Sequence, residues 1–349
     1  MENDIFVTFV VPVFNAELFL KSFFLSLSSQ TYQKFQCLFV FDKGNDDTLE
    51  ILKRMVESSS FPCQILEKPS KEGVGKARDY ALDSGLISTK YIMFIDVDDQ
   101  LDPSFLEKLV CKAESEKADM TICGCQKIDA KTNRVLANVM VNNPSSLTNF
   151  FDNNILLYIN PAMWNKLLLF SLVGQIRFVY KGGGEDGMFL LKILPKCKKI
   201  CFINEPLYKY LVHENSLITT TDETFLEMSK RMYLDTKKFY QIQGGEYQSF
   251  FCLLDSYAFL RLGIGETTRV CFNDWRSSLR ITKSVKRFLD CYFPSWRDSP
   301  YLSFNRSRKY GIKGLLVWRC RLLYKINLFP LFFIDYFLFT KIFRKDVRW

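Results

Sequence analysis

The sequence predicts an α/β fold, with a Rossmann-like, mostly parallel sheet flanked by helices and a mainly helical C-terminal extension. Strand-like and helix-like stretches alternate along the first third of the chain, which favours a parallel sheet. At 349 residues the chain is long enough for one large domain plus an extension. A hydrophobic content of 48% excludes a mainly disordered protein.

The elements of the first third follow from periodicity and from the residues that interrupt it. Short runs of mainly apolar residues indicate strands, and apolar residues at helical spacing indicate the helices between them. The predicted strands are Ile5–Val11, Gln36–Phe41, Cys63–Glu67, Tyr91–Ile95 and Met120–Cys125, and the predicted helices are Ala16–Ser29, Thr48–Glu57, Gly75–Gly85 and Pro103–Glu116.

Three of these strands end at residues that could form a site. Pro12, Asp42 and Asp96 each come directly after a predicted strand. Ligands of parallel α/β sheets bind at the carboxyl ends of the strands. We therefore expect these three residues to lie along one edge of the sheet.

The rest of the chain is less regular and more helical. Residues 129–160 show no clear pattern, and the later predicted helices are Met188–Leu194, Thr224–Tyr240, Tyr247–Ile264 and Gly314–Ile326. The resulting organisation is an α/β domain at 1–220, a helical region at 221–300 and a basic, aromatic tail at 301–349.

An acidic cluster, Asp96-Val97-Asp98-Asp99, follows the fourth predicted strand. Carboxylates this close repel one another, so protons or a cation must compensate them. Mg²⁺ and Mn²⁺ take oxygen ligands and bridge carboxylates to phosphates. The cluster is thus a candidate site for a metal and a diphosphate, and the alternative is a solvated acidic turn.

A second acidic pair, Glu185-Asp186, follows three glycines at 182–184. Glycines let a backbone approach a ligand closely, and a fixed carboxylate is a suitable general base. The alternative is an ordinary helix start, where acidic residues are common.

Four further residues are candidates that their local sequence leaves open. Trp164 could stack on a sugar ring and Lys166 could reach a phosphate, or they could be a half-buried Trp and a surface Lys. The single histidine, His213, is either structural, a metal ligand or a donor to a diphosphate. Arg78 lies in a segment that does not fit GxGxxG, and the chain has no GxxxxGK[ST].

Cysteine usage and the N-terminus favour the cytoplasm. The eleven cysteines form no repeated CxxC pair, and Cys123 and Cys125 alone are too few for a zinc site. We therefore expect reduced thiols. The segment MENDIFVTFVVPVF has no basic region or cleavage site of a signal peptide.

Taken in order, the motifs resemble those of the family 2 glycosyltransferases, inverting enzymes of the GT-A fold. The similar segments are VTFVVPVFN, FDKGND, GVGKARDYAL, YIMFIDVDDQLDP, PAMWNKLL, GGGEDGMFLLKIL and YKYLVHENSLIT. Together they cover about residues 5–220. Lys43 stands where the family usually has a second Asp, and Asp79 where it has Asn.

The resemblance implies a role for each candidate residue. Asp186, with Glu185, would be the catalytic base, and Asp98 and His213 would hold Mn²⁺ or Mg²⁺. The residues implied in binding the nucleotide-sugar donor are Pro12, Phe14, Asp42 (to uracil), Arg78, Asp96 (at the ribose), Trp164, Lys166 and His213. The implied reaction moves a sugar, with UDP as the expected nucleotide, to a hydroxyl of a glycan or lipid-linked acceptor in cell-surface polysaccharide synthesis.

The tail at 301–349 carries the whole net charge of the chain. It has eleven Lys/Arg against two Asp, a net +9, so residues 1–300 sum to zero. Because the tail is also rich in Phe and Leu, a membrane surface fits it better than a nucleic acid does. The apolar stretch Asn327–Thr340 is broken by Pro330 and Asp335, so we expect no spanning helix.

We therefore expect an interfacial anchor at the inner face of the cell membrane. Its expected flanking cations are Arg319, Arg321, Lys341, Arg344, Lys345 and Arg348. The alternatives are a helical lid on the core and a contact in a homodimer. For the whole protein, the alternatives are an inactive binding partner in a glycan assembly complex and a nucleotidyltransferase, although the Gly-rich, basic phosphate loop of the latter is missing after the first strand.

Overall fold

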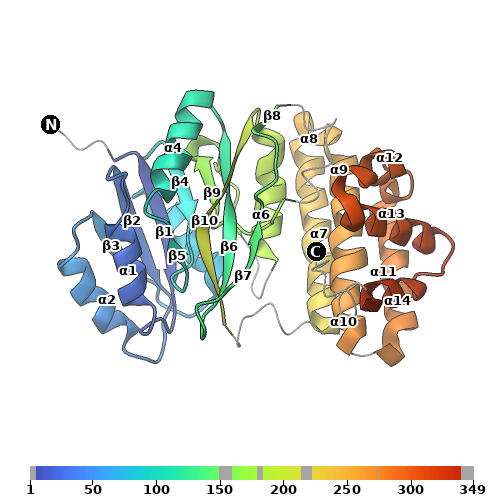
Figure 1. Cartoon of the computed structure of the whole chain (residues 1–349), viewed down its shortest axis with the longest axis horizontal. Helices are drawn as coiled ribbons and strands as arrows, with labels where there is room; N and C mark the ends of the chain where they lie inside the picture. The colour runs from blue at the N-terminus through green and yellow to red at the C-terminus, as the bar shows by residue number, and fades with distance from the viewer. Residues whose placement is uncertain (1–4, 149–158, 179–183, 214–221, 274, 339–349) are drawn as a thin grey trace. The chain divides into compact units, whose positions relative to one another are not determined.

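A computed structural model describes residues 5–148, 159–178, 184–213, 222–273 and 275–338 (Figure 1). The chain forms two compact units, which we describe separately. The first unit comprises Met1–Thr148 and Asn160–Leu217, and the second comprises Asn149–Ile159 and Ile218–Trp349. The three-part organisation expected from the sequence, at 1–220, 221–300 and 301–349, stays a prediction.

The first unit is built on one mixed sheet with the strand order β3-β2-β1-β4-β9-β6-β10-β5. The four strands β3, β2, β1 and β4 are mutually parallel, as is the pair β6–β10. The remaining pairings are antiparallel, so the α/β class is confirmed but the parallel part is narrower than expected. The strands are β1 Val7–Val13, β2 Phe35–Phe41, β3 Cys63–Glu67, β4 Tyr91–Phe94, β5 Gln100–Leu101, β6 Met120–Asp129, β7 Val135–Val139, β8 Ser146–Leu147, β9 Lys166–Leu169 and β10 Ile200–Val212.

Helices cover both faces of this sheet. On one face, Phe9, Phe39 and Met93 share a core with α1 (Leu20–Ser28), α2 (Thr48–Glu57) and α4 (Phe105–Glu116). On the other face, Phe94 contacts Phe189 of α6 (Glu185–Ile193), and α3 (Val74–Asp83) lies on β1 and β2. The alternation of side chains along each strand produces these two faces.

Two boundaries in the first unit differ from the sequence prediction. β1 runs through Pro12 to Val13, because the missing N–H of Pro12 points toward the neighbouring β4, which has already ended at Phe94. The first helix begins at Leu20 instead of Ala16. Asn15 adopts a left-handed conformation (φ +45°), and the backbone N–H of Ala16 donates to Thr48 Oγ1 at 2.7 Å.

The second unit is helical. Within the described residues it contains α7 Glu223–Gln243, α8 Glu246–Ser249, α9 Phe251–Ala258, a π-helix Phe259–Glu266, α10 Thr267–Asn273, α11 Ser278–Tyr292, α12 Phe304–Ser307, α13 Gly311–Lys325 and α14 Leu331–Phe337. Its core includes the buried indole of Trp296, which stacks on Phe259 at 4.8 Å. No helix in the described part of the chain is long and apolar enough to cross a membrane.

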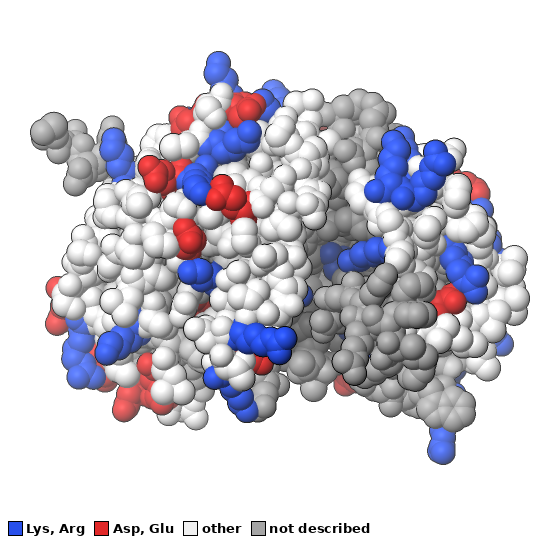
Figure 2. All heavy atoms as spheres, viewed as in Figure 1, with Lys and Arg blue, Asp and Glu red and all other residues white. Residues whose placement is uncertain are grey.

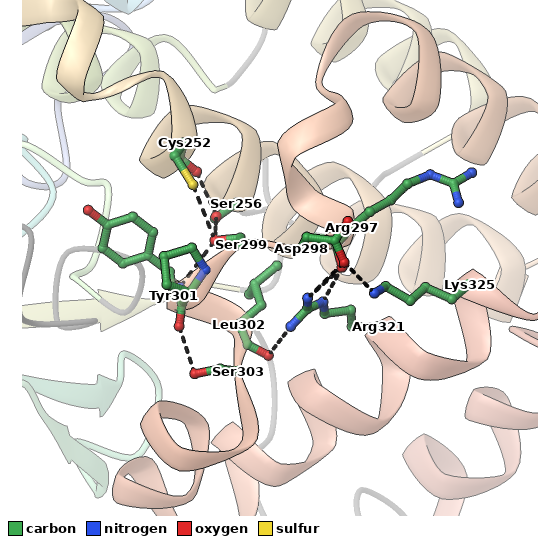
Figure 3. Close-up of polar contacts among 11 residues, drawn as sticks. Cys252, Ser256, Arg297, Asp298, Ser299, Tyr301, Leu302, Ser303, Arg321 and Lys325 are labelled. Carbon is green, nitrogen blue, oxygen red and sulfur yellow. Dashed lines mark hydrogen bonds and ion pairs between the residues drawn. The ribbon is translucent and has the colours of Figure 1, made fainter.

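Arg321 belongs to the interior of this unit and not to a membrane-facing surface as expected. Its guanidinium donates to the carbonyl oxygens of Arg297 and Leu302, and it is 9% exposed (Figure 3). Beside this contact, the hydroxyl groups of Ser299 and Ser256 form a hydrogen bond with 2.6 Å between their oxygens. These hydrogen bonds fix the segment between α11 and α12. Because the guanidinium of Arg321 is buried in them, the expectation that it flanks a membrane anchor is wrong.

The end of β2 is tied to the segment that leads into α3. Asp42, directly after β2, is 3% exposed and accepts from Lys68 Nζ at 3.0 Å. It also accepts from the backbone N–H groups of Glu72 (3.0 Å) and Gly73 (2.7 Å), just before α3. Burial alone would raise the pKa of Asp42, but Lys68 and the two backbone donors lower it below its ordinary value.

This arrangement predicts a pH-dependent cost for Asp42→Asn. A lowered native pKa means that the carboxylate stabilises the fold above its unfolded pKa, and that this contribution is lost as the pH falls through the native pKa. We expect a loss of about 2 kcal/mol at neutral pH, narrowing below about pH 4. Urea unfolding at pH 7 and pH 3 measures it.

The matched control for this prediction is Asp47→Asn. Asp47 is exposed and makes no side-chain cap to α2, so its substitution should change the unfolding free energy by less than about 0.5 kcal/mol. An Asp42→Asn cost that is equal at the two pH values would contradict the ionic origin of the contribution.

Candidate active site

Arg78 of α3 lies at the centre of the candidate site. One guanidinium nitrogen donates to Asp96 at 2.9 Å and another to Asp186. The side chain is 2% exposed and lies 5.1 Å from the centre of the Phe178 ring. Burial lowers the pKa of Arg78, but the two carboxylates raise it more, so the guanidinium stays charged. Arg78 is therefore an interior residue and not part of a solvent-exposed helix face.

Asp186 is held at both of its carboxylate oxygens. Oδ1 accepts from Arg78, and Oδ2 accepts from the backbone N–H of Met163 at 3.0 Å. Asp186 lies in the first turn of α6, after Gly184, whose positive φ of 86° suits glycine. The side chain remains 21% exposed, whereas the neighbouring Glu185 is buried. Asp186 is thus an oriented carboxylate that solvent can reach.

The acidic cluster after β4 separates into three environments. Asp96 faces Arg78, and burial raises its pKa to about 7, with Asp98 and Asp186 adding to the rise that Arg78 opposes. Asp99 is 1% exposed and accepts from Tyr208 Oη (2.6 Å) and the backbone N–H of Leu211 (2.8 Å), both on β10. Asp99 therefore joins the cluster to β10, in keeping with a structural role.

Asp98 and His213 form the part of the site that suits a divalent metal. Burial raises the pKa of Asp98, and its own backbone N–H and the neighbouring His213 oppose the rise. His213 follows the end of β10 with its ring 5.0 Å from that of Phe19. Its Nε2 is buried and has no hydrogen-bond partner among the described residues. A carboxylate and an imidazole are donors that Mn²⁺ accepts.

Two protein donors do not make a complete coordination shell. Among the described residues, no group of three or more His, Cys, Asp or Glu side chains is placed to hold a metal. Magnesium-type sites commonly combine one or two carboxylates with phosphate oxygens and water. The chain therefore fits a metal that is completed by a bound diphosphate.

Lys166 does not have the role that the resemblance implies. It is fully buried at the start of β9, and its ammonium donates to Asn160 O (2.8 Å), Ala162 O (2.5 Å) and Asn165 Oδ1 (2.8 Å). Its three protons are thus directed at protein oxygens, and the prediction that Lys166 reaches a phosphate is wrong in this structure. Instead it holds residues 160–165, from which Met163 donates to Asp186.

Trp164 is also more buried than expected. It is 7% exposed, and its indole stacks on Tyr208 at 4.3 Å and lies 5.8 Å from Tyr210, both on β10. The structure therefore shows a packing role for Trp164. Stacking of its indole on a sugar ring stays a prediction.

The first strand end contributes an exposed aromatic ring. Phe14 follows β1, is 38% exposed, and has Lys71 Nζ at 3.9 Å from its ring centre. Pro12 is half-buried in β1. Sequence reasoning missed Lys68 and Lys71, although both stand in KPSKEG, between β3 and α3. Lys68 is far along the chain from its partner Asp42, and Lys71 is far from Phe14, so no local sequence pattern indicates these contacts.

Comparisons with known proteins agree with this geometry. The family model described as "Glycosyl transferase family 2" matches residues 8–171. Glycosyltransferase GlyA of Streptococcus pneumoniae is 25% identical over 65% of this chain, but the match spans only 34% of the length of GlyA. The processive diacylglycerol beta-glycosyltransferase of Mycoplasma pneumoniae is 26% identical, over 66% of this chain and 72% of its own.

A solved structure extends the similarity to the fold. TarS 1–349 of S. aureus, in complex with UDP-GlcNAc, superposes with a TM-score of 0.68 at 15% identity, over 95% of this chain and 91% of its own. This supports the GT-A arrangement of the sheet and its helices. The ordered motifs, the sheet and these relatives together support a family 2 glycosyltransferase domain within this chain.

Proposed function

We propose that the protein transfers a sugar from a UDP-sugar to an acceptor hydroxyl with inversion at the anomeric carbon, and that Asp186 is the general base. The observation that carries this proposal is the fixed orientation of the Asp186 carboxylate by Arg78 and the Met163 N–H. Such a carboxylate removes the hydroxyl proton as the oxygen attacks opposite the leaving diphosphate. Glu185, buried beside it, keeps its proposed place in the catalytic pair.

Donor binding is proposed at the carboxyl ends of β1, β2 and β4. Phe14 with Lys71 offers an exposed cationic and aromatic edge, and Asp96 lies beside Arg78 at the end of β4. Asp42 keeps its proposed contact with uracil, although its oxygens already accept from Lys68, Glu72 and Gly73. UDP as the nucleotide is supported by the UDP-GlcNAc complex of TarS, which has the same fold.

Asp98 and His213 are proposed to hold Mn²⁺ or Mg²⁺ together with the donor diphosphate. A bound divalent ion neutralises charge that develops on the leaving diphosphate. The half-buried carboxylate of Asp98 and the unpartnered Nε2 of His213, within the described residues, support this assignment.

The acceptor is proposed to be a glycan or a lipid-linked glycan of the cell surface, used at the inner face of the cell membrane. Names of two relatives support this class. One is a processive diacylglycerol beta-glycosyltransferase, and another is the poly(ribitol-phosphate) beta-glucosyltransferase of Bacillus spizizenii. The alternative of an inactive binding partner is tested by the first experiment below.

Asp186→Asn should keep donor binding and lose turnover. Removal of a general base costs about 10²- to 10⁴-fold in rate. Transfer or hydrolysis is measured over a panel of UDP-sugars with Mn²⁺, and donor binding by protection against thermal unfolding. Asp83→Asn, which removes an exposed carboxylate paired with Arg177, is the control and should keep full activity.

Two outcomes would count against the proposal. Turnover of Asp186→Asn within about threefold of the unsubstituted protein would remove Asp186 as the base. If the unsubstituted protein binds a UDP-sugar but neither transfers nor hydrolyses any of them, the inactive-partner alternative holds.

Lys166→Met should lower kcat while leaving the KM for the donor nearly unchanged. Without the ammonium, residues 160–165 lose their anchor and the Met163 N–H moves away from Asp186, and a displacement of about 1 Å can cost about 10²-fold in rate. Lys108→Met, which removes an exposed lysine paired with Glu205, is the control. A raised donor KM with an unchanged kcat would instead place Lys166 at the phosphates.

Removal of divalent metal with EDTA should abolish turnover, and Mn²⁺ should restore it. In Asp98→Asn the Mn²⁺ concentration for half-maximal activity should rise by about 100-fold, because a carboxylate ligand is lost. Asp129→Asn, at the exposed end of β6, should need no more Mn²⁺ than the unsubstituted protein. Full activity in EDTA would show that the reaction needs no metal.

A further inference from the structure

Helix α13 and Ile326, which directly follows it, expose a row of large aliphatic side chains to solvent. Ile312, Leu315, Leu322 and Ile326 are 38% to 61% exposed and recur at spacings of three, seven and four residues. These spacings place them on one face of a helix. Arg319 lies on the same face. The opposite face of α13 supplies buried residues such as Val317 and Tyr324 to the core of the second unit.

Helix α14 extends this row. Leu331 and Ile334 are 45% and 58% exposed. Asp335, next to Ile334, forms an ion pair with Arg319 at 2.5 Å, which holds α14 against the middle of α13. We call the six residues Ile312, Leu315, Leu322, Ile326, Leu331 and Ile334 the apolar ridge. Soluble monomers rarely leave such a row uncovered.

The surroundings of the apolar ridge are strongly basic. The described part of the tail, 301–338, has seven Lys/Arg and one Asp, a net +6. Arg308 and Lys309 are exposed just before α13. On the face drawn in Figure 2, Lys and Arg side chains outnumber acidic ones over the C-terminal unit, whereas both signs are mixed over the N-terminal one.

A small hollow lies next to the ridge. It is lined by Lys283 and Lys286 of α11, by Tyr324 of α13, and by Asn327 and Pro330 of the α13–α14 turn. Lys286 is paired with Asp290 at 2.7 Å, whereas the side chain of Lys283 is exposed. The hollow thus offers a cation and an amide beside the exposed aliphatic groups.

We propose that the apolar ridge docks on the surface of an anionic lipid bilayer, with its aliphatic side chains among the acyl-chain ends of the headgroup layer. Aliphatic groups combined with surrounding positive charge match an anionic lipid surface. A second copy of this chain is a poorer match, because two surfaces of net positive charge repel each other. Unlike the anchor expected from sequence, this surface uses α13 as well as the later apolar stretch, and it does not use Arg321.

Sedimentation with lipid vesicles tests the proposal on the full chain, without donor or metal. We expect binding to vesicles that contain phosphatidylglycerol and little binding to vesicles of phosphatidylcholine alone. Ile326→Asn/Ile334→Asn should weaken the binding by about tenfold or more. Arg308→Gln/Lys309→Gln should weaken it by about fivefold for each charge removed, with a smaller salt dependence.

The controls are matched in exposure and charge. Leu18→Asn/Ile242→Asn removes two aliphatic side chains that are each 81% exposed and lie outside the ridge, and it should leave vesicle binding unchanged. Lys21→Gln/Lys34→Gln should weaken binding less than Arg308→Gln/Lys309→Gln does. Every substituted side chain is exposed or half-exposed, so we expect all variants to fold. Thermal unfolding of each variant measures this.

The results that would overturn the proposal are separate from those that test sugar transfer. Equal binding to neutral and anionic vesicles, or binding that the ridge variant leaves unchanged, would remove the ridge as the docking surface. A dimer in light scattering that Ile326→Asn/Ile334→Asn disrupts, without vesicle binding, would make a second copy the occupant. Transfer to a water-soluble acceptor should be unchanged in the ridge variant, so loss of docking and loss of catalysis are distinguishable.

Discussion

The candidate site depends on one buried charge, the guanidinium of Arg78. A guanidinium removed from water is stable only when acceptor groups meet its N–H groups with good geometry, and at Arg78 these acceptors are carboxylates. Those carboxylates are Asp96, at the end of β4, and Asp186, at the start of α6, which are 18 and 108 residues away along the chain. The pairing therefore brings α3, β4 and α6 together. The single side chain of Arg78 therefore orients both Asp186, the proposed base, and Asp96, which is proposed to bind the donor.

Repulsion between neighbouring carboxylates explains why the acidic cluster divides its roles. Asp96 is matched by Arg78, and Asp99 is buried against the hydroxyl of Tyr208. Asp98 has His213 as its neighbour, and the imidazole Nε2 has no hydrogen-bond partner in the described part of the chain. Among the described residues, Asp98 has no Lys, Arg or Tyr partner of the kind that holds Asp96 and Asp99, and it is the member proposed to bind a metal.

Two buried lysines show how loops are held in place around the site. Lys68 anchors Asp42 and the segment before α3, and Lys166 anchors residues 160–165, which reach Asp186 through Met163. Buried ammonium groups need partners for their protons, so each lysine fixes several backbone or side-chain oxygens at once. The second unit uses the same device in Arg321, whose guanidinium donates to the carbonyl oxygens of Arg297 and Leu302.

The sequence by itself determined the elements whose signals are local and the order of the motifs. Periodicity located α2 and β3 to the residue, and the strand ends at Asp42 and Asp96 were predictable from the alternation. Burial and partners were decided by the tertiary structure: Arg78 and Lys166 are interior, Trp164 packs on Tyr208, and β9 inserts antiparallel between β4 and β6. These features depend on contacts between residues far apart in the chain, which a local pattern cannot encode.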